Sequence, residues 1–162
     1  MPKESSLLMM NESINPSSFF QGPLPGTVSE FWRLVWEQRV GVVVMITNLV
    51  EQGKRKCEQY WPETGSLMLG LIEVTIVQES VQAHCTVRTL RLRHTRLQRR
   101  AEAGAVREVT QHQYTSWPDH GTPTNIAPVL SFIKKSSSAC QVRHKIKRTH
   151  GSNLASNTFV FT

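Results

Sequence analysis

Residues 42–47 read VVVMIT, a short run of β-branched and apolar residues with no polar alternation. Such a run is typical of a strand with both faces buried, since alternation is expected where one face meets water. Just before it, Phe31, Leu34 and Val35 recur at i, i+3 and i+4, the spacing of an amphipathic helix. A helix followed at once by a buried strand predicts an α/β or mixed α+β domain.

The predicted helix has both a start and a stop signal. Residues 22–26, GPLPG, form a turn-rich entry. Thr27 and Glu30 have the Ser/Thr-x-x-Glu spacing of a capping box, and the charge of Glu30 suits the N-terminal end of the helix dipole. Gly41 is placed to end the helix.

Further elements are predicted along the chain. Three more strands are expected, at residues 71–78, 82–93 and 106–115. The charged stretch 96–105 is predicted to be a loop. A helix is predicted from about Asn125, and its Pro128 is tolerated because it falls in the first turn.

Both ends of the chain lack a regular pattern. Residues 1–18 are rich in Ser and Asn with no sustained period, so we expect them to be poorly ordered. From Ser136 onward the sequence is rich in Ser, Asn, His and basic residues, again with no clear period.

The net charge of +7 is concentrated near the C-terminus. Residues 120–162 hold no Asp or Glu and six basic residues, which leaves 13 basic and 12 acidic residues in the other 119. A basic tail can bind nucleic acid or act as a nuclear address. The plainer alternative, which we favour, is a solvated tail with no specific partner. Nucleic acid is therefore not an expected partner.

The sequence favours an intracellular location. The longest apolar run, residues 40–50, is too short to span a bilayer, and the N-terminal residues do not resemble a signal peptide. Three cysteines without regular spacing indicate reduced thiols. We therefore expect a cytoplasmic chain with no membrane segment.

Four segments resemble, in the same order, the middle of receptor-type protein tyrosine phosphatase domains. They are residues 21–27 (QGPLPGT), 31–37 (FWRLVWE), 56–62 (KCEQYWP) and 117–123 (WPDHGTP). The similarity is closest to the branch with the gamma and zeta receptors and their insect relatives. It implies an incomplete phosphatase fold, a twisted mixed sheet flanked by helices.

The resemblance divides the chain into three parts. Residues 21–138 are expected to form a partial phosphatase domain. Residues 1–20 are a non-matching N-terminal segment, expected to be disordered, and residues 139–162 are a basic non-matching tail. The abrupt joins suggest a truncated gene model, an alternative transcript or a spliced fragment.

The resemblance also implies the chemistry, hydrolysis of phosphotyrosine in proteins through a cysteinyl phosphate, with no cofactor and no metal. Asp119 matches the family's general acid, which protonates the leaving phenolate and then activates the water. Trp117 and Pro118 match the stiff side of its loop, and Gly121 would allow the loop to close. Taken alone, the same residues are good chemistry for an ordinary surface turn.

Two further residues match family positions. Glu51 matches the glutamate that pairs with the arginine of the phosphate-binding loop, and Lys56 matches the lysine that approaches the loop aspartate. The alternative is that both belong to a solvated charge run from 51 to 56.

The family's phosphate-binding loop, His-Cys-x5-Arg with glycines between, is missing after Asp119. There Cys140 is followed six residues later by Ile146, with no glycine between. His84-Cys85 with Arg91 fits the pattern literally, but it precedes the acid and has the pattern of a strand. A strand directs its amides to alternate sides and cannot surround a phosphate. We expect Cys85 to be a small core residue and assign no nucleophile.

The prediction is therefore a phosphatase-like chain that is inactive as it stands. The alternative is a non-catalytic interaction fragment or a truncated product. Because the family's sheet has a central strand before the missing loop, we also expect residues 42–47 and their neighbours to have unpaired edges and exposed apolar faces. A marginally stable or partly molten chain would follow.

Overall fold

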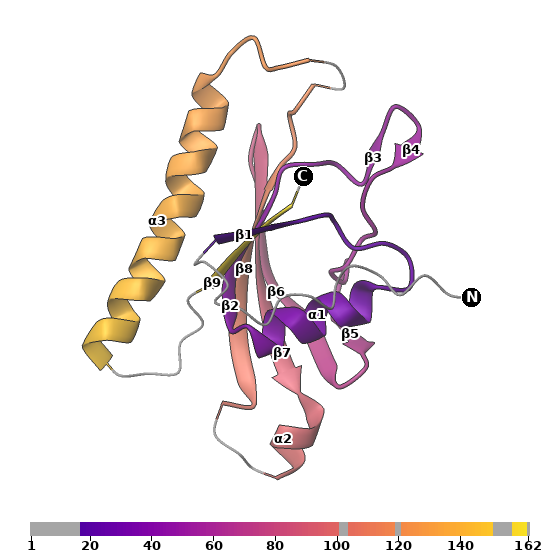
Figure 1. Ribbon diagram of the computed structural model, residues 1–162, viewed down its shortest axis with the longest axis vertical. Coiled ribbons are helices and arrows are strands. Elements are labelled where there is room, and N and C mark those ends of the chain that lie inside the picture. Colours follow the sequence, from indigo (N-terminus) through magenta and orange to yellow (C-terminus); the bar gives the residue numbers. More distant parts are fainter. Residues whose placement is uncertain (1–16, 101–103, 119–120, 151–156, 162) are drawn as a thin grey trace.

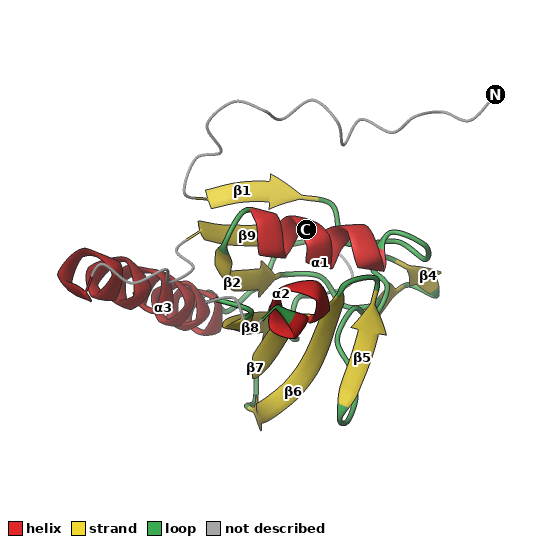
Figure 2. Ribbon diagram, turned by 90° about the horizontal axis from the view of Figure 1, so that it is seen from below, coloured by secondary structure: helices red, strands yellow, loops and turns green. Residues whose placement is uncertain are grey.

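The computed structural model describes residues 17–100, 104–118, 121–150 and 157–161. Most strands belong to one twisted, seven-stranded sheet, with helices on both faces (Figures 1 and 2). The strand order is β1-β9-β2-β8-β7-β6-β5. The pairs β1–β9, β9–β2 and β2–β8 are parallel, and the pairs β8–β7, β7–β6 and β6–β5 are antiparallel. The predicted mixed sheet flanked by helices is confirmed.

The elements have the following bounds. The strands are β1 Ser17–Phe20, β2 Val40–Met45, β3 Val50–Glu51, β4 Lys54–Arg55, β5 Ser66–Leu69, β6 Ile72–Val81, β7 Cys85–His94, β8 Val106–Tyr114 and β9 Asn157–Phe161. The helices are α1 Val28–Glu37, α2 Thr95–Arg99 and α3 Ala127–His150. The strands predicted at 42–47, 71–78, 82–93 and 106–115 are all present, with ends shifted by a few residues.

Strand β2 is buried on both faces, as its sequence predicts. Val43 and Met45 belong to a core cluster shared with α1, whereas Val42 and Val44 belong to a second cluster under α3. The period-two alternation of a strand sends these neighbours to opposite faces. Each fully buried valine contributes roughly 1.5–3 kcal/mol relative to an exposed one, so both layers depend on β2.

Helix α1 is confirmed, with Thr27 as its N-cap residue and Glu30 in its first turn, but the predicted capping hydrogen bond and the predicted glycine stop are wrong. The Thr27 hydroxyl does not cap the helix: it donates to Leu24 O (3.1 Å) and accepts from Leu24 N (2.9 Å), closing the preceding turn. At the other end, Arg39 adopts the left-handed conformation (φ 50°) expected after a helix. Gly41 instead lies inside β2, so it is not the stop.

The charged stretch 96–105 was predicted to be a loop, but it begins with helix α2. His94 is the N-cap of this helix, and its Nδ1 accepts a hydrogen bond from Leu97 N (3.4 Å). The helix is too short for an apolar period to predict it. Residues 101–103 lie outside the described residues.

The ends of the chain are more regular than predicted. Residues 17–20 form β1, although residues 1–20 were expected to be disordered; residues 1–16 lie outside the described residues. Beyond Ser136, where no period was found, α3 continues to His150, and the basic tail also contains β9. Backbone hydrogen bonds sustain both elements, and such bonds leave no mark in side-chain periodicity.

Strand β9 covers the edge of β2 that was expected to be unpaired. It pairs in parallel with β2 on the side opposite to β8, with Val43 opposite Phe159 and Val44 opposite Val160. Val160 packs, partly buried, against the cluster under α3. The predicted unpaired edge at residues 42–47 is therefore wrong, because the chain's own C-terminal segment covers it.

This pairing predicts the effect of a short truncation. Deleting residues 157–162 should lower the free energy of unfolding by at least about 2 kcal/mol, because each buried backbone group of β2 left unpaired costs about 1–3 kcal/mol. The open edge should also promote self-association. Urea unfolding and light scattering measure the two effects. Deletion of Thr162 alone is the control, and equal stability of both truncations would contradict the pairing.

Candidate active site

The segment that bears the predicted acid leaves the sheet at the end of β8. Thr115 N donates to His84 O (3.0 Å), and Ser116 Oγ lies 3.1 Å from His84 Nδ1, so the β6–β7 hairpin holds the start of the segment. Trp117 is half-buried and packs edge-on against Tyr114, with ring centroids 6.2 Å apart.

The structure places part of the predicted acid loop. Pro118 is half-buried, and Gly121 has φ +72° with open space where a Cβ would be. An L side chain would be strained at that φ, so Gly121 suits the turn. Asp119, the predicted general acid, lies outside the described residues together with His120.

Glu51 closes the turn that follows β2. Its Oε1 accepts hydrogen bonds from Thr47 Oγ1 (2.8 Å) and Asn48 N (3.1 Å). The next two residues, Gln52 and Gly53, both have positive φ, which is the geometry of a two-residue hairpin between β3 and β4. The half-buried Glu51 therefore has a local structural contact, beyond that of a solvated charge run.

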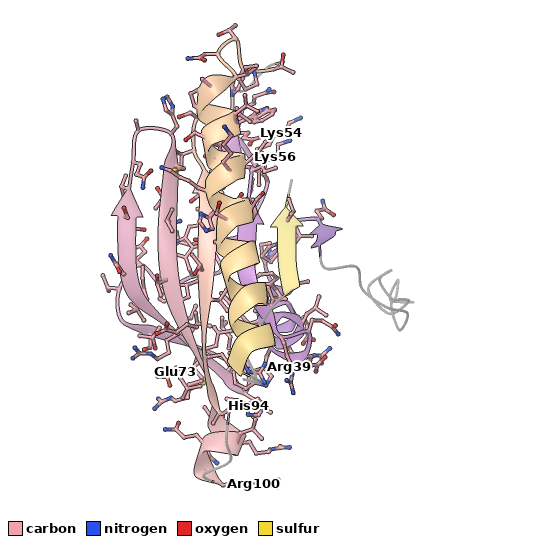
Figure 3. The ribbon with its side chains drawn as sticks, turned by 90° about the vertical axis from the view of Figure 1, so that its left-hand side faces the viewer. Arg39, Lys54, Lys56, Glu73, His94 and Arg100 are labelled. Carbon is pink, nitrogen blue, oxygen red and sulfur yellow. The ribbon has the colours of Figure 1, made fainter. Side chains whose placement is uncertain are left out.

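Lys56 follows the same hairpin. Its backbone N donates to Leu49 O (2.9 Å), and its side chain is exposed. Figure 3 shows Lys54 and Lys56 at one end of the molecule and Arg39, His94 and Arg100 near the other. Lys56 thus lies at the end of the sheet towards which β2 points.

The parallel pairing of β2 and β8 brings these segments to one edge. Met45 lies opposite Gln113, so both chains leave the sheet at the same level. The chain after β2, which leads to the turn of Glu51, and the acid-bearing segment after β8 therefore leave the sheet at the same edge. Ligand sites in α/β folds lie at the carboxyl ends of parallel strands. This edge is the candidate active site.

The segments that carried the family resemblance also contact one another. Gly22 packs so closely on Cys57 that a Cβ there would lie 2.8 Å from Cys57 Sγ. The Trp32 indole Nε1 donates to Tyr60 O (2.6 Å). These contacts join residues 21–27 and α1 to residues 56–62.

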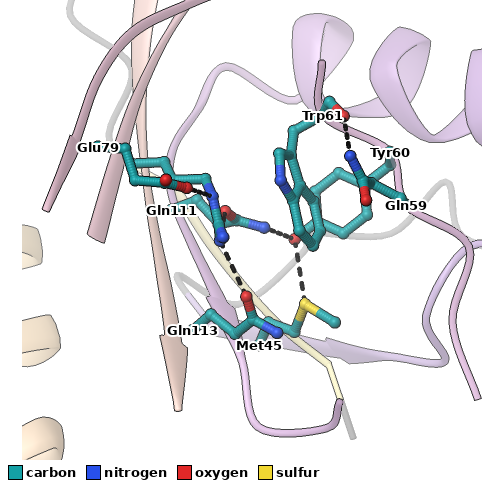
Figure 4. Close-up of polar contacts among 8 residues, drawn as sticks. Met45, Gln59, Tyr60, Trp61, Glu79, Gln111 and Gln113 are labelled. Atoms are coloured by element: carbon teal, nitrogen blue, oxygen red, sulfur yellow. Dashed lines mark hydrogen bonds and ion pairs between the residues drawn. The ribbon is translucent and has the colours of Figure 1, made fainter. Parts of the chain in front are cut away.

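A buried polar network beneath this edge was not predicted. Gln111 Nε2 donates to Tyr60 Oη (2.6 Å), which in turn donates to Met45 Sδ (3.8 Å) (Figure 4). Arg88 Nη1 donates to Gln111 Oε1 (3.0 Å) and Gln113 Oε1 (2.9 Å). The alternating Gln111 and Gln113 on a predicted strand were the available signal, since both point to the same face.

Arg88 is the centre of this network. Its Nε donates to Glu79 Oε2 (2.5 Å), and its guanidinium lies over the Trp61 ring, 4.4 Å from the centroid. A buried arginine is tolerated when its donors and charge are matched in this way. It joins β7, β6 and residues 56–62 to the end of β8, which carries the acid-bearing segment.

Comparison with known proteins gives the family. The sequence model of the protein-tyrosine phosphatase family matches residues 6–155. The chain belongs to the protein-tyrosine phosphatase family. The matched range extends on both sides of residues 21–138, over which the sequence motifs showed the resemblance.

Several of the similar relatives are receptor-type tyrosine-protein phosphatases by name. The chain is 53% identical over 126 residues to the receptor-type tyrosine-protein phosphatase mosPTP-1 of Aedes aegypti, and 52% identical over 119 residues to tyrosine-protein phosphatase 99A of Drosophila melanogaster. It is 49% identical over 121 residues to human receptor-type tyrosine-protein phosphatase zeta. These matches cover 76%, 74% and 74% of the chain but 10%, 9% and 5% of the relatives.

The described thiols do not have the environment of a phosphatase nucleophile. Burial, and next the charge of Glu58, raise the pKa of Cys57 to about 11. Cys85 is buried in the extended strand β7, in the cluster under α3, which confirms the prediction of a small core residue. The side chain of Cys140 lies outside the described residues, although its backbone is helical. A nucleophilic thiolate requires a lowered pKa and surrounding amide donors.

The Tyr60 phenol is a further ionisable group in the core. Burial raises the pKa of the Tyr60 phenol well above its ordinary value, so Tyr60 is a neutral hydrogen-bonding group. No group of three or more His, Cys, Asp or Glu side chains that could hold a metal occurs within the described ranges. Among the described helices, none is both long and apolar enough to cross a bilayer.

The arginine network predicts a large difference between two substitutions on the same strand. Arg88→Met should cost about 3 kcal/mol of unfolding free energy, because it leaves the buried amide oxygens of Gln111 and Gln113 without their donor. Arg91→Met, which removes an exposed pair with Glu108 (3.6 Å), should cost less than about 0.5 kcal/mol. Urea denaturation measures both, and similar losses would show that Arg88 does not hold the core together.

The raised pKa of Cys57 predicts an unreactive thiol. A shift from 9.0 to about 11 lowers the thiolate fraction roughly a hundredfold, and burial slows access further. In a Cys85→Ser, Cys140→Ser variant, 5,5′-dithiobis(2-nitrobenzoate) should react with Cys57 at least about 100-fold more slowly than with glutathione at pH 7.5. The same variant in guanidinium is the control, and rapid reaction of the folded protein would contradict the buried placement.

Proposed function

We propose that this chain provides the acid-bearing half of a tyrosine phosphatase site and does not hydrolyse phosphotyrosine by itself. Asp119 takes the role of general acid towards a phenolate leaving group. Trp117 and Pro118 form the stiff side of its loop, and Gly121 is the flexible side. The observation that carries the proposal is the family membership together with the absence of a glycine-containing Cys-x5-Arg loop after Asp119.

The chemistry explains why the acid alone is insufficient. Cleavage of the phosphotyrosine ester begins when a thiolate attacks phosphorus, with amide N–H groups and an arginine around the phosphoryl oxygens. The leaving phenolate accepts the proton of the acid only as the P–O bond breaks. Cys85 lies in a strand, whose amides alternate in direction and cannot form such a cradle.

The remaining predicted residues take supporting roles in this proposal. The position of Glu51 and Lys56 at the edge where the acid-bearing segment emerges supports their assignment to the site. The contacts of Glu51 Oε1 with Thr47 and Asn48 leave its other carboxylate oxygen for a partner such as an arginine. Phosphotyrosine proteins are the proposed substrates or ligands, and the cytoplasm is the proposed location.

A non-catalytic role is the second candidate. The same fold, with the loop of Asp119 but no nucleophile, would act as a phosphatase-like interaction fragment. The pairing of β9 with β2 favours a chain that folds and persists, which an interaction role requires.

An assay with a phosphotyrosyl peptide tests the proposal. The purified 162-residue chain should release no phosphate above the background of its Asp119→Asn variant. Circular dichroism should show both proteins folded. Turnover that Cys85→Ser abolishes would identify the strand cysteine as a nucleophile and overturn the proposal. Turnover that Cys140→Ser abolishes would instead identify the cysteine in α3 as the nucleophile, and it would also overturn the proposal.

A further inference from the structure

A cavity of about 210 Å³ lies between the tip of the β6–β7 hairpin and the first turns of α3. Hairpin residues 82–85 form one wall. The other wall consists of Pro128, Ser131, Phe132 and Lys135, spaced along one side of the helix. Figure 1 shows the tip of this hairpin next to the first turns of α3. None of the residues assigned to the candidate active site lines it.

The size and walls of the cavity suit one aromatic ring. A cavity of about 150 Å³ inside a protein is large enough to bind benzene. Phe132 is buried here with 5% of its surface exposed, and Ala83 and Pro128 add further apolar surface. Small-molecule sites have this character, mostly apolar with a few placed polar groups.

The polar groups of the cavity favour a negative charge. Lys135 Nζ donates to Gln82 Oε1 (2.7 Å), which holds the ammonium at the cavity and leaves its other N–H donors available. Ser131 adds a hydroxyl. No Asp or Glu is among the described residues that line the cavity, and the sequence has none at 80–101 or 120–162. Glu79, just before the hairpin tip, pairs with Arg88.

The hairpin wall is held in place before any ligand binds. Gln82 N donates to Cys85 O (2.9 Å), which closes the hairpin tip. Ser116 Oγ donates to Ala83 O (3.4 Å), and Thr115 N donates to His84 O (3.0 Å). A wall fixed in this way lowers the entropic cost of binding, because no loop has to be ordered.

We propose that this cavity is a binding site for a small anion with one aromatic ring, an arylcarboxylate. The ring lies against Phe132 and Pro128, and the carboxylate accepts hydrogen bonds from Lys135 Nζ and Ser131 Oγ. This site is separate from the acid-bearing loop and goes beyond the proposed function. It does not depend on phosphatase activity.

A titration with sodium benzoate, followed by amide NMR, tests the site. Saturable shifts should be confined to residues 82–85 and 128–135, with a dissociation constant on the order of 1 mM for a ligand of this size. Lys135→Met should weaken binding about fivefold or more, since it removes the charge-assisted hydrogen bond. Lys134→Met, the exposed neighbour on α3, is the matched control and should change binding less than about twofold.

The opposite results would overturn the proposal. Three results would each show that no arylcarboxylate site exists. They are an equal loss of benzoate affinity in the two lysine variants, amide shifts at every basic residue, and binding of neutral benzamide as tight as that of benzoate. An Ala83→Leu variant supplies a second test, because its larger side chain fills the cavity from the exposed hairpin tip. It should abolish the saturable shifts without changing the thermal midpoint, and benzoate binding retained in this variant would contradict the assigned location.

Discussion

The burial of β2 on both faces and its pairing on both edges is the constraint on which the rest of the structure depends. Val43 and Met45 require the cover of α1, and Val42 and Val44 require the cover of α3. The backbone groups of β2 need partners on each side, which β8 and β9 supply. Because the side chains of β2 are apolar in both directions, no neighbour can be omitted without exposing apolar surface or unpaired amides to water.

The buried network around Arg88 connects this core to the candidate site. In this network Arg88 contacts three parts of the chain: Glu79 on β6, Gln111 and Gln113 on β8, and the ring of Trp61. Strand β8 ends at Tyr114 and passes directly into the acid-bearing segment. The orientation of that segment therefore depends on polar groups within the sheet as well as on apolar packing. Such a network is sensitive to the loss of any member, because each buried polar group would then lack a partner.

Much of the fold could be predicted from local pattern, and the exceptions have physical reasons. The run at residues 42–47 predicted a strand buried on both faces because alternation was absent, and the spacing of Phe31, Leu34 and Val35 predicted α1. The capping hydrogen bond and the glycine stop were predicted wrongly, since the Thr27 hydroxyl bonds to Leu24 and Arg39 takes the left-handed conformation instead of a glycine. The strand β9 could not be predicted, because its pairing with β2 is a long-range contact between backbones. The site residues were named by motif, whereas Arg88 and its glutamine partners depend on three-dimensional contacts.

Pairing the edges of the sheet and forming a catalytic phosphate-binding loop place separate requirements on the sequence. A strand such as β9 can satisfy the edge of β2 with backbone hydrogen bonds and apolar side chains, and many sequences meet that demand. A phosphate-binding loop requires amides that converge on one point, glycines that permit the bend, and a thiol with a lowered pKa. In this chain the described thiols lie in a strand and in a turn where burial raises the pKa. The same burial that stabilises Cys57 as a core residue raises its pKa and so opposes the charged form that nucleophilic attack needs. A chain of this family can therefore keep its layered fold while neither of its described thiols lies in such a loop.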